Sequence, residues 1–172
     1  MKYIAFIVGV ISLLISAYYA KAELGIAKAE LHNSKGQKVG VATLIEERNG
    51  VRIALQVYNL PPGLHGFHIH GVGKCEPPDY KSAGGHFNPY GKKHGLKNPE
   101  GHHAGDIPNL LVRADGTATV EVLISLVTLD PGKNSLFQPG GTALVIHAGS
   151  DDQMSDPSGN SGDRIACGVI TK

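Results

Sequence analysis

The segment from Gly71 to Pro108 limits what this chain can fold into more than any other feature of the sequence. It is rich in glycine and proline, and it shows neither the two-residue period of a strand nor the period of an amphipathic helix, which is typical of a loop. Loops of this length are rare inside compact domains unless a function or a bound metal orders them. We therefore expect a compact fold that carries one long, ordered loop.

Short segments with an alternating apolar pattern lie on both sides of this loop and indicate β-strands. The clearest is 51–58, where apolar and more polar residues alternate directly after the hairpin signal Asn49-Gly50. The expected strands, about eight in number, cover 24–31, 39–45, 51–58, 63–70, 110–112, 117–127, 142–147 and 164–171. Because no segment has a convincing helical period, the sequence predicts an all-β protein, a barrel or a sandwich.

The N-terminal residues have the three parts of a secretory signal peptide. Lys2 supplies a positive charge, 4–17 is an almost unbroken apolar run, and Ala20-Lys21-Ala22 is a small-x-small cleavage signal. The apolar run is short for a membrane span, which needs about 20 residues. We therefore expect residues 1–22 to be removed. The mature domain, residues 23–172, is expected to be exported, soluble and without stable membrane association.

The charge and the cysteines of the mature chain fit this expectation. Removal of Lys2 and Lys21 takes the formal charge from +1 to about −1. This balance gives no indication of nucleic acid or an acidic membrane as a partner. In an exported chain we expect Cys75 and Cys167 to form a disulfide, and the alternative is two buried free thiols. A closed loop of roughly 90 residues would stabilise the fold by about 4–5 kcal/mol through chain entropy.

His68 and His70 stand two residues apart in the expected strand 63–70. Side chains alternate between the two faces of a strand, so these imidazoles share one face, roughly 7 Å apart along the strand. The pair is a candidate chelate, and the alternative is two solvated surface histidines. His65 lies three residues before His68, so we expect it on the opposite face, as a structural residue that hydrogen-bonds backbone near the long loop.

Further candidate ligands follow in the long loop and at the end of a later strand. Neutral imidazole suits zinc and copper, and aspartate adds a harder oxygen that zinc accepts in a four-coordinate site. The candidates are His86, His94, His103 and Asp106 in the loop and His147 at the end of 142–147. Each alone is more often structural or solvated, whereas their joint pattern with the histidine pair favours a metal centre.

Taken together, these motifs resemble the copper/zinc superoxide dismutase family. The segments that carry the resemblance are 63–70, 84–89, 94–95, 103–106, 141–147 and 162–170. The resemblance runs from the first mature strand to the C-terminus, and the signal peptide and the insertion with Cys75 are similar to the bacterial periplasmic branch. It implies a flattened, immunoglobulin-like, eight-stranded Greek-key β-barrel with two long functional loops.

The resemblance also implies one copper ion and one zinc ion per subunit. The implied copper ligands are His68, His70, His86 and His147. The implied zinc ligands are His86, His94, His103 and Asp106, so that His86 bridges the two metals. Next to the ligand His103, His102 is expected to be exposed, and His32 is expected at the surface.

Three further roles follow from the same resemblance. Asp151 matches the carboxylate that hydrogen-bonds ligands of both metals, and Arg164 matches the guanidinium beside the open copper face. Cys75 and Cys167 match the family's disulfide. The loop between 142–147 and 164–171 is acidic and lacks lysine.

Two lysines that flank Cys75, Lys74 and Lys81, are therefore our candidates for steering an anion to the site. The alternative is that both are ordinary solvated loop residues.

The implied activity is the dismutation of superoxide to dioxygen and hydrogen peroxide by a redox-cycling copper. Arg164 would dock the anion, and His86 would hold and deliver a proton. The alternative is a noncatalytic exported protein that binds or stores copper and zinc. We expect a location in the periplasm or outside the cell, superoxide as the substrate, and either a homodimer or a monomer.

Overall fold

The computed structural model describes residues 25–172, and the expected signal peptide lies outside the described residues. The strands are β1 (Ile26–Asn33), β2 (Lys38–Glu47), β3 (Gly50–Val57), β4 (Gly63–His65), β5 (Phe67–His70), β6 (Leu110–Val112), β7 (Ala118–Ile124), β8 (Ala143–His147) and β9 (Arg164–Val169). One 3₁₀ turn, η1 (Lys81–Ala83), lies in the long loop. Within residues 25–172 no helix is long and apolar enough to cross a membrane. The all-β prediction is therefore confirmed.

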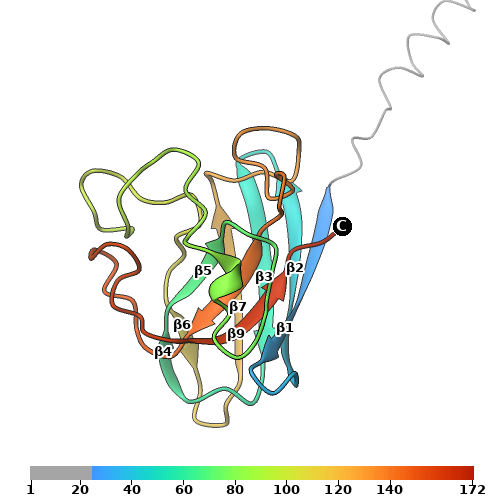
Figure 1. Ribbon diagram of the computed structural model, residues 1–172, viewed down its shortest axis with the longest axis vertical. Coiled ribbons are helices and arrows are strands. Elements are labelled where there is room, and N and C mark those ends of the chain that lie inside the picture. The colour runs from blue at the N-terminus through green and yellow to red at the C-terminus, as the bar shows by residue number, and fades with distance from the viewer. Residues whose placement is uncertain (1–24) are drawn as a thin grey trace, which may run out of the picture.

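Seven strands form one curled antiparallel sheet in the order β5-β8-β9-β1-β2-β3-β7, while β4 pairs with β6 in a small second sheet (Figure 1). Several neighbours in the sheet are far apart in the chain. β1 pairs with β9, β3 pairs with β7, and β5 pairs with β8. These long crossing connections are typical of a Greek-key barrel, the expected fold class.

The expected strand 63–70 is two strands in the structure. β4 pairs with β6 and β5 pairs with β8, and Gly66 separates them. A Cβ at Gly66 would lie 2.7 Å from the Cβ of Ser161, so the later loop packs directly on this point. The chain changes sheets here because glycine allows that close approach. The expected strand 117–127 is also shorter, ending at Ile124.

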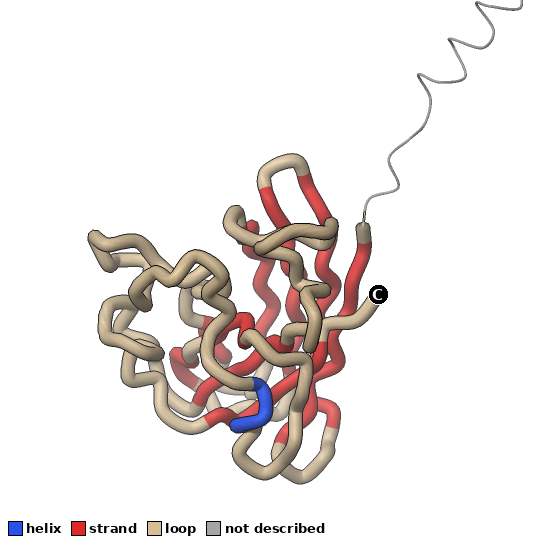
Figure 2. Tube along the Cα trace, turned by 45° about the horizontal axis from the view of Figure 1, so that its top comes forward, coloured by secondary structure: helices blue, strands red, loops and turns tan. Residues whose placement is uncertain are grey.

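Burial differs between the strands in a way that positions the site. β3 alternates as expected, with its valine, isoleucine and leucine side chains in the main core. All residues of β5 and β8 are buried. Phe67 and Ile69 of β5 join the main core, whereas His68 and His70 occupy the opposite face. His68 and His70 are at most 1% exposed, so the histidine pair is enclosed and not solvated. The loops gather on one side of the strands (Figure 2).

The long loop is fastened to the barrel by the expected disulfide. Cys75 and Cys167 are bonded, with their Cα atoms 5.6 Å apart and a sequence separation of 92. A second apolar cluster surrounds this link and covers the outer face of β8. It consists of Tyr80, Ala83, Ala143, Val145 and Cys167, with Cys75 packed against it.

Candidate metal centre

Backbone pairing brings the long loop alongside strand β5. β5 is the end strand of the seven-stranded sheet, and loop residues cover its free edge. Ile69 N donates to Gly105 O at 2.9 Å, and Phe87 N donates to Ile69 O at 2.8 Å. A Cβ at Gly105 would lie 2.3 Å from Ile69 O, so the approach requires glycine. This pairing sets the residues next to Phe87 and Gly105, His86 and Asp106, beside the histidine pair of β5.

Four histidines converge on one point. His68 and His70 come from β5, His86 from the loop and His147 from the end of β8, and one ring nitrogen of each lies within 4.8 Å of the others. In two of them a backbone carbonyl orients the second ring nitrogen: His70 Nδ1 donates to Gly84 O at 2.9 Å, and His147 Nδ1 donates to Gly162 O at 3.0 Å. Because a carbonyl only accepts, the Nε2 lone pairs of these two rings face the centre.

Two buried nitrogens at this point have no hydrogen-bond partner among the described residues, His68 Nδ1 and His86 Nε2. Leaving a buried polar atom unpaired costs about 1–3 kcal/mol, so native structures rarely do so. Both atoms point to the place where His70 Nε2 and His147 Nε2 meet at 3.4 Å. A neutral four-imidazole set of this kind suits copper or zinc, so the residues present fit a metal ion.

A second group of candidate ligands shares His86. His86 Nδ1 and His94 Nδ1 lie 2.8 Å and 3.0 Å from Asp106 Oδ1, and His103 Nδ1 lies 3.4 Å from His86 Nδ1. The other oxygen of Asp106 is occupied, because Oδ2 accepts from the backbone N–H groups of Gly95 and His103. Three imidazoles and one carboxylate oxygen at this spacing fit a closed, four-coordinate zinc site.

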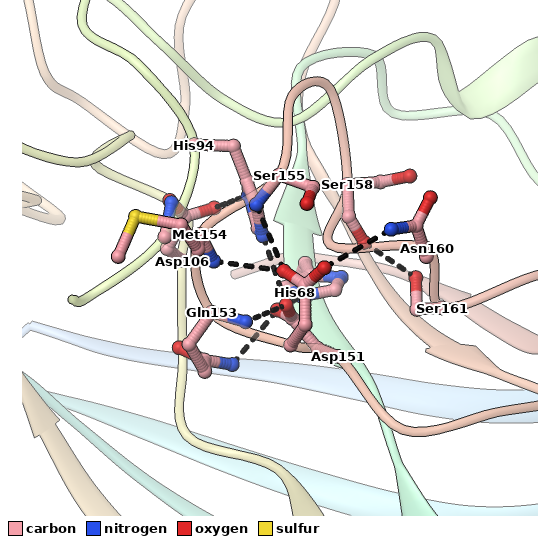
Figure 3. Close-up of polar contacts among 12 residues, drawn as sticks. His68, His94, Asp106, Asp151, Gln153, Met154, Ser155, Ser158, Asn160 and Ser161 are labelled. Atoms are coloured by element: carbon pink, nitrogen blue, oxygen red, sulfur yellow. Dashed lines mark hydrogen bonds and ion pairs between the residues drawn. The ribbon is translucent and has the colours of Figure 1, made fainter. Parts of the chain in front are cut away.

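Asp151 connects the two groups (Figure 3). Its Oδ2 accepts from His68 Nε2 at 2.8 Å, and its Oδ1 accepts from His94 Nε2 at 3.0 Å. Asn109 fixes the backbone of Asp151, since Asn109 Oδ1 accepts from Asp151 N at 2.9 Å and Asn109 Nδ2 donates to Asp151 O at 2.8 Å. One carboxylate therefore orients one imidazole of each group.

Burial sets the protonation of the shared centre. It lowers the pKa of His86 and of His147 to about 4, so both rings are neutral near pH 7 and offer a lone pair. His94 behaves differently, because the hydrogen bonds to Asp106 and Asp151 outweigh burial and raise its pKa to about 9. Metal binding at His94 thus competes with a proton, whereas His86 and His147 are ready to bind.

Arg164 lies at the entrance to the four-histidine group. It lines a cavity of about 340 Å³ together with His70, His86 and His147. Its guanidinium is held by the long loop, as Nη1 donates to the Tyr80 carbonyl and Nη2 to the Gly84 carbonyl, both at 2.6 Å. Partial burial lowers the pKa of Arg164, but an arginine remains charged. The cavity therefore has a fixed positive charge beside the histidines.

The two lysines expected to steer an anion differ in position. Lys81 lines a neighbouring cavity of about 470 Å³ together with Arg164, but its Nζ is paired with Asp79 Oδ2 at 3.0 Å. Lys74 is exposed and lines neither of these cavities. Only Lys81 is brought next to the site.

The remaining histidines stand outside both groups. His65 is buried, and its two ring nitrogens contact the carbonyls of His147 and Pro61, each at 2.8 Å, so its partners lie on β8 and before β4 and not in the long loop. His102 and His32, expected at the surface, are half-buried. The ring of His102 contacts the carbonyl of His103. None of His32, His65 and His102 belongs to either group of candidate ligands.

Sequence reasoning missed two residues that hold Asp151, namely Asn109 and Gln153. The only sequence signal is an amide side chain close to a candidate residue. Asn109 lies three residues after Asp106, and Gln153 lies two residues after Asp151. Polar residues are common in loops, so that signal does not separate them from solvated neighbours.

Comparison with known proteins agrees with this geometry. The family model described as copper/zinc superoxide dismutase matches residues 38–170. Copper–zinc superoxide dismutase 1 of Aquifex aeolicus is 60% identical over 144 residues, which cover 83% of this chain and 85% of that protein. Superoxide dismutase-like protein YojM of Bacillus subtilis is 44% identical over 144 residues, covering 82% of this chain and 74% of YojM.

Solved structures give the same result. The crystal structure of a SOD-like protein from Bacillus subtilis has a TM-score of 0.81 at 42% identity, and covers 85% of this chain and 98% of that chain. The Cu/Zn superoxide dismutase from Brucella abortus has a TM-score of 0.70 at 29% identity. The match covers 86% of this chain and 100% of that chain. Fold, candidate ligands and relatives lead to one conclusion: the chain belongs to the copper/zinc superoxide dismutase family.

Proposed function

We propose that this protein dismutates superoxide, converting two superoxide anions and two protons into dioxygen and hydrogen peroxide. The observation that carries the proposal is the pair of ligand groups that share His86, with Arg164 beside the open one. In this assignment copper would be held by His68 Nδ1 and by the Nε2 atoms of His70, His86 and His147. Zinc would be held by His86, His94, His103 and Asp106.

The two metals have different tasks. Copper supplies one-electron redox chemistry when bound, whereas zinc has a filled d shell and supplies none. The cavity of about 340 Å³ is lined by His70, His86 and His147 of the four-histidine group and also by His103 of the zinc group, while His94 and Asp106 are enclosed. Copper is assigned to the four-histidine group because its donors are all imidazoles, and zinc to the group that includes a carboxylate.

Arg164 and His86 act on the substrate in this proposal. Arg164 docks the anion in the cavity, because its guanidinium keeps a full charge and is immobilised by two loop carbonyls. His86 lines the same cavity, and its Nε2, when it did not hold copper, would take up a proton and pass it to the nascent peroxide. The second proton comes from water.

Steering of the anion is assigned to Lys74 and Lys81, with Lys81 the stronger candidate because it shares a cavity with Arg164. Its ion pair with exposed Asp79 reduces the field that it contributes. Replacing both lysines by alanine is expected to lower the rate at low salt and to flatten its dependence on ionic strength. Stopped-flow rates measured across ionic strengths would disprove the assignment if they matched the wild type.

The experiment that tests the function combines metal analysis with turnover. The mature protein, loaded with copper and zinc, is analysed by mass spectrometry while superoxide consumption is measured. One copper and one zinc per chain, with activity lost on removal of copper and largely kept on removal of zinc, supports the proposal. Stoichiometric metal without turnover would favour a noncatalytic copper and zinc store instead.

Location and assembly are part of the proposal. The disulfide between Cys75 and Cys167 is expected in an oxidising compartment, which supports export to the periplasm or beyond after cleavage of residues 1–22. Residues 23–172 would then form the mature domain. Whether that domain is a monomer or a homodimer can be measured by sedimentation of the metal-loaded protein.

A further inference from the structure

Gln153 is a buried polar residue. It is not a candidate ligand, and it does not line the cavity of about 340 Å³ beside Arg164. It lies in the loop between β8 and β9, only 7% exposed, and its φ of 64° is in the left-handed region that glutamine rarely adopts. Its carbonyl accepts from Lys97 N at 3.1 Å, and Gly95 packs so closely that a Cβ there would lie 2.2 Å away. Such a conformation persists only where the surroundings fix it.

The side-chain amide of Gln153 contacts Asp151, the carboxylate that reaches both groups of candidate ligands (Figure 3). Its Nε2 donates to Asp151 Oδ2 at 2.8 Å and to the carbonyl of Ile107 at 3.3 Å. Both partners are acceptors, so the NH₂ group must face them, and the orientation of the amide follows from the chemistry. Asp151 Oδ2 is also the oxygen that His68 Nε2 reaches, and Ile107 directly follows Asp106.

Asp151 needs this support because its carboxylate accepts from two imidazoles at once. His68 approaches one oxygen and His94 the other, so rotation of the carboxylate would break at least one of the two bonds. Gln153 contacts both oxygens, through Nε2 at Oδ2 and through its backbone N–H at Oδ1, 2.6 Å away. One residue therefore opposes rotation from both sides.

We propose that Gln153 is a positioning residue of the metal centre, whose amide holds the Asp151 carboxylate against His68 and His94 and couples it to the backbone beside Asp106. The inference rests on the proposed function, since it takes His68 and His94 as metal ligands. Partners of ligating histidines contribute roughly 10–100-fold in metal affinity. Gln153 acts one step further out, through Asp151, so removing its amide is expected to weaken both copper and zinc binding about tenfold.

The test compares Gln153→Met with Met154→Leu. Methionine keeps the length and volume of glutamine, but its side chain cannot donate a hydrogen bond. Met154 is the control position, because it is the next residue and is 44% exposed. Copper and zinc affinities of the full mature protein are measured by chelator competition, and the Cu(II) electron paramagnetic resonance spectrum is recorded. Gln153→Met is expected to bind both metals about tenfold more weakly and to change the copper hyperfine splitting, while Met154→Leu matches the wild type.

A second variant keeps the test decisive if Gln153→Met does not fold. Gln153→Gly suits the positive φ and also removes the amide, so it is expected to lose the same affinity. A merely structural role would lower the unfolding midpoint of the metal-free protein but leave both affinities and the copper spectrum unchanged, and that result would overturn the inference. If the wild type itself failed to bind copper and zinc, the proposed function would fail instead.

Discussion

The two ends of the seven-stranded sheet are buried in different ways. Around β3, one face of each strand packs into the main core and the other faces solvent, so apolar and polar residues alternate. β5 and β8 are buried on both faces, because the long loops cover the face that β3 leaves open. The loops that provide this cover also carry most of the candidate ligands.

This difference shows where each half obtains its stability. The β2–β3–β7 half is held by backbone pairing between the strands and by their own apolar side chains in the main core. The β5–β8 half requires the loops to stay in place, and they are held by the disulfide, by edge pairing and by contacts among polar groups. Metal binding should therefore stabilise the β5–β8 half far more than the other.

Removal of both metals gives the largest expected effect. A ligand at 1,000 times its dissociation constant stabilises the folded state by about 4 kcal/mol, and that contribution is lost on chelation. Hydrogen exchange should accelerate in 71–109 and 148–163, while amides of β2 and β3 stay protected until global unfolding. Equal acceleration in both halves would show that the metals do not stabilise the β5–β8 half more than the other.

Leu55→Ala tests the half of the sheet that does not carry the site. Leu55 is fully buried in the main core, so the change is expected to cost about 2–5 kcal/mol in the free energy of unfolding. Denaturant unfolding measures that cost, and metal affinity of the folded variant should equal that of the wild type. The exposed neighbour Gln56, changed to alanine, is the control and should move stability by less than about 0.5 kcal/mol.

Gly105→Ala tests the edge pairing on the β5 side. Its Cβ would lie 2.3 Å from Ile69 O, a backbone atom that cannot move aside, so a cost of about 1–3 kcal/mol and weaker metal binding are expected. Gly85→Ala is the matched control, because it lies in the same loop and a Cβ there meets nothing within 4 Å. If calorimetry and metal titration found the two variants alike, the edge contact would not hold the loop.

The smallest expected effect is a pH dependence from Asp152, in the loop that covers β5. Hydrogen bonds, chiefly from the backbone N–H of Ser155, lower the pKa of Asp152 to about 2. Because the unfolded value is about 3.9, its contribution to stability is present above that pH and is lost as pH falls through about 2. Asp152→Asn should therefore lower the thermal midpoint of the metal-free protein at pH 6 and have little effect near pH 2.

Most of the barrel was predictable because strand periodicity is local. The alternation in 51–58 and the Asn49-Gly50 turn placed β3 within a residue, and the strand 110–112 has its expected bounds. The break at Gly66 was not predicted, since it depends on Ser161, nearly a hundred residues later. The early end of β7 was missed for a similar reason: its length is set by pairing with β3.

By itself, the sequence determined the all-β class, the cysteine pair and, through the resemblance, the set of candidate ligands. Only the tertiary structure decided which nitrogen of each ring faces the centre, that Lys81 and not Lys74 lies near Arg164, and that Gln153 supports Asp151. The physical reason is the separation along the chain of the residues that determine each feature. Side-chain alternation is fixed by neighbours in the chain, whereas these arrangements depend on loops that meet only after the sheet has brought distant segments together.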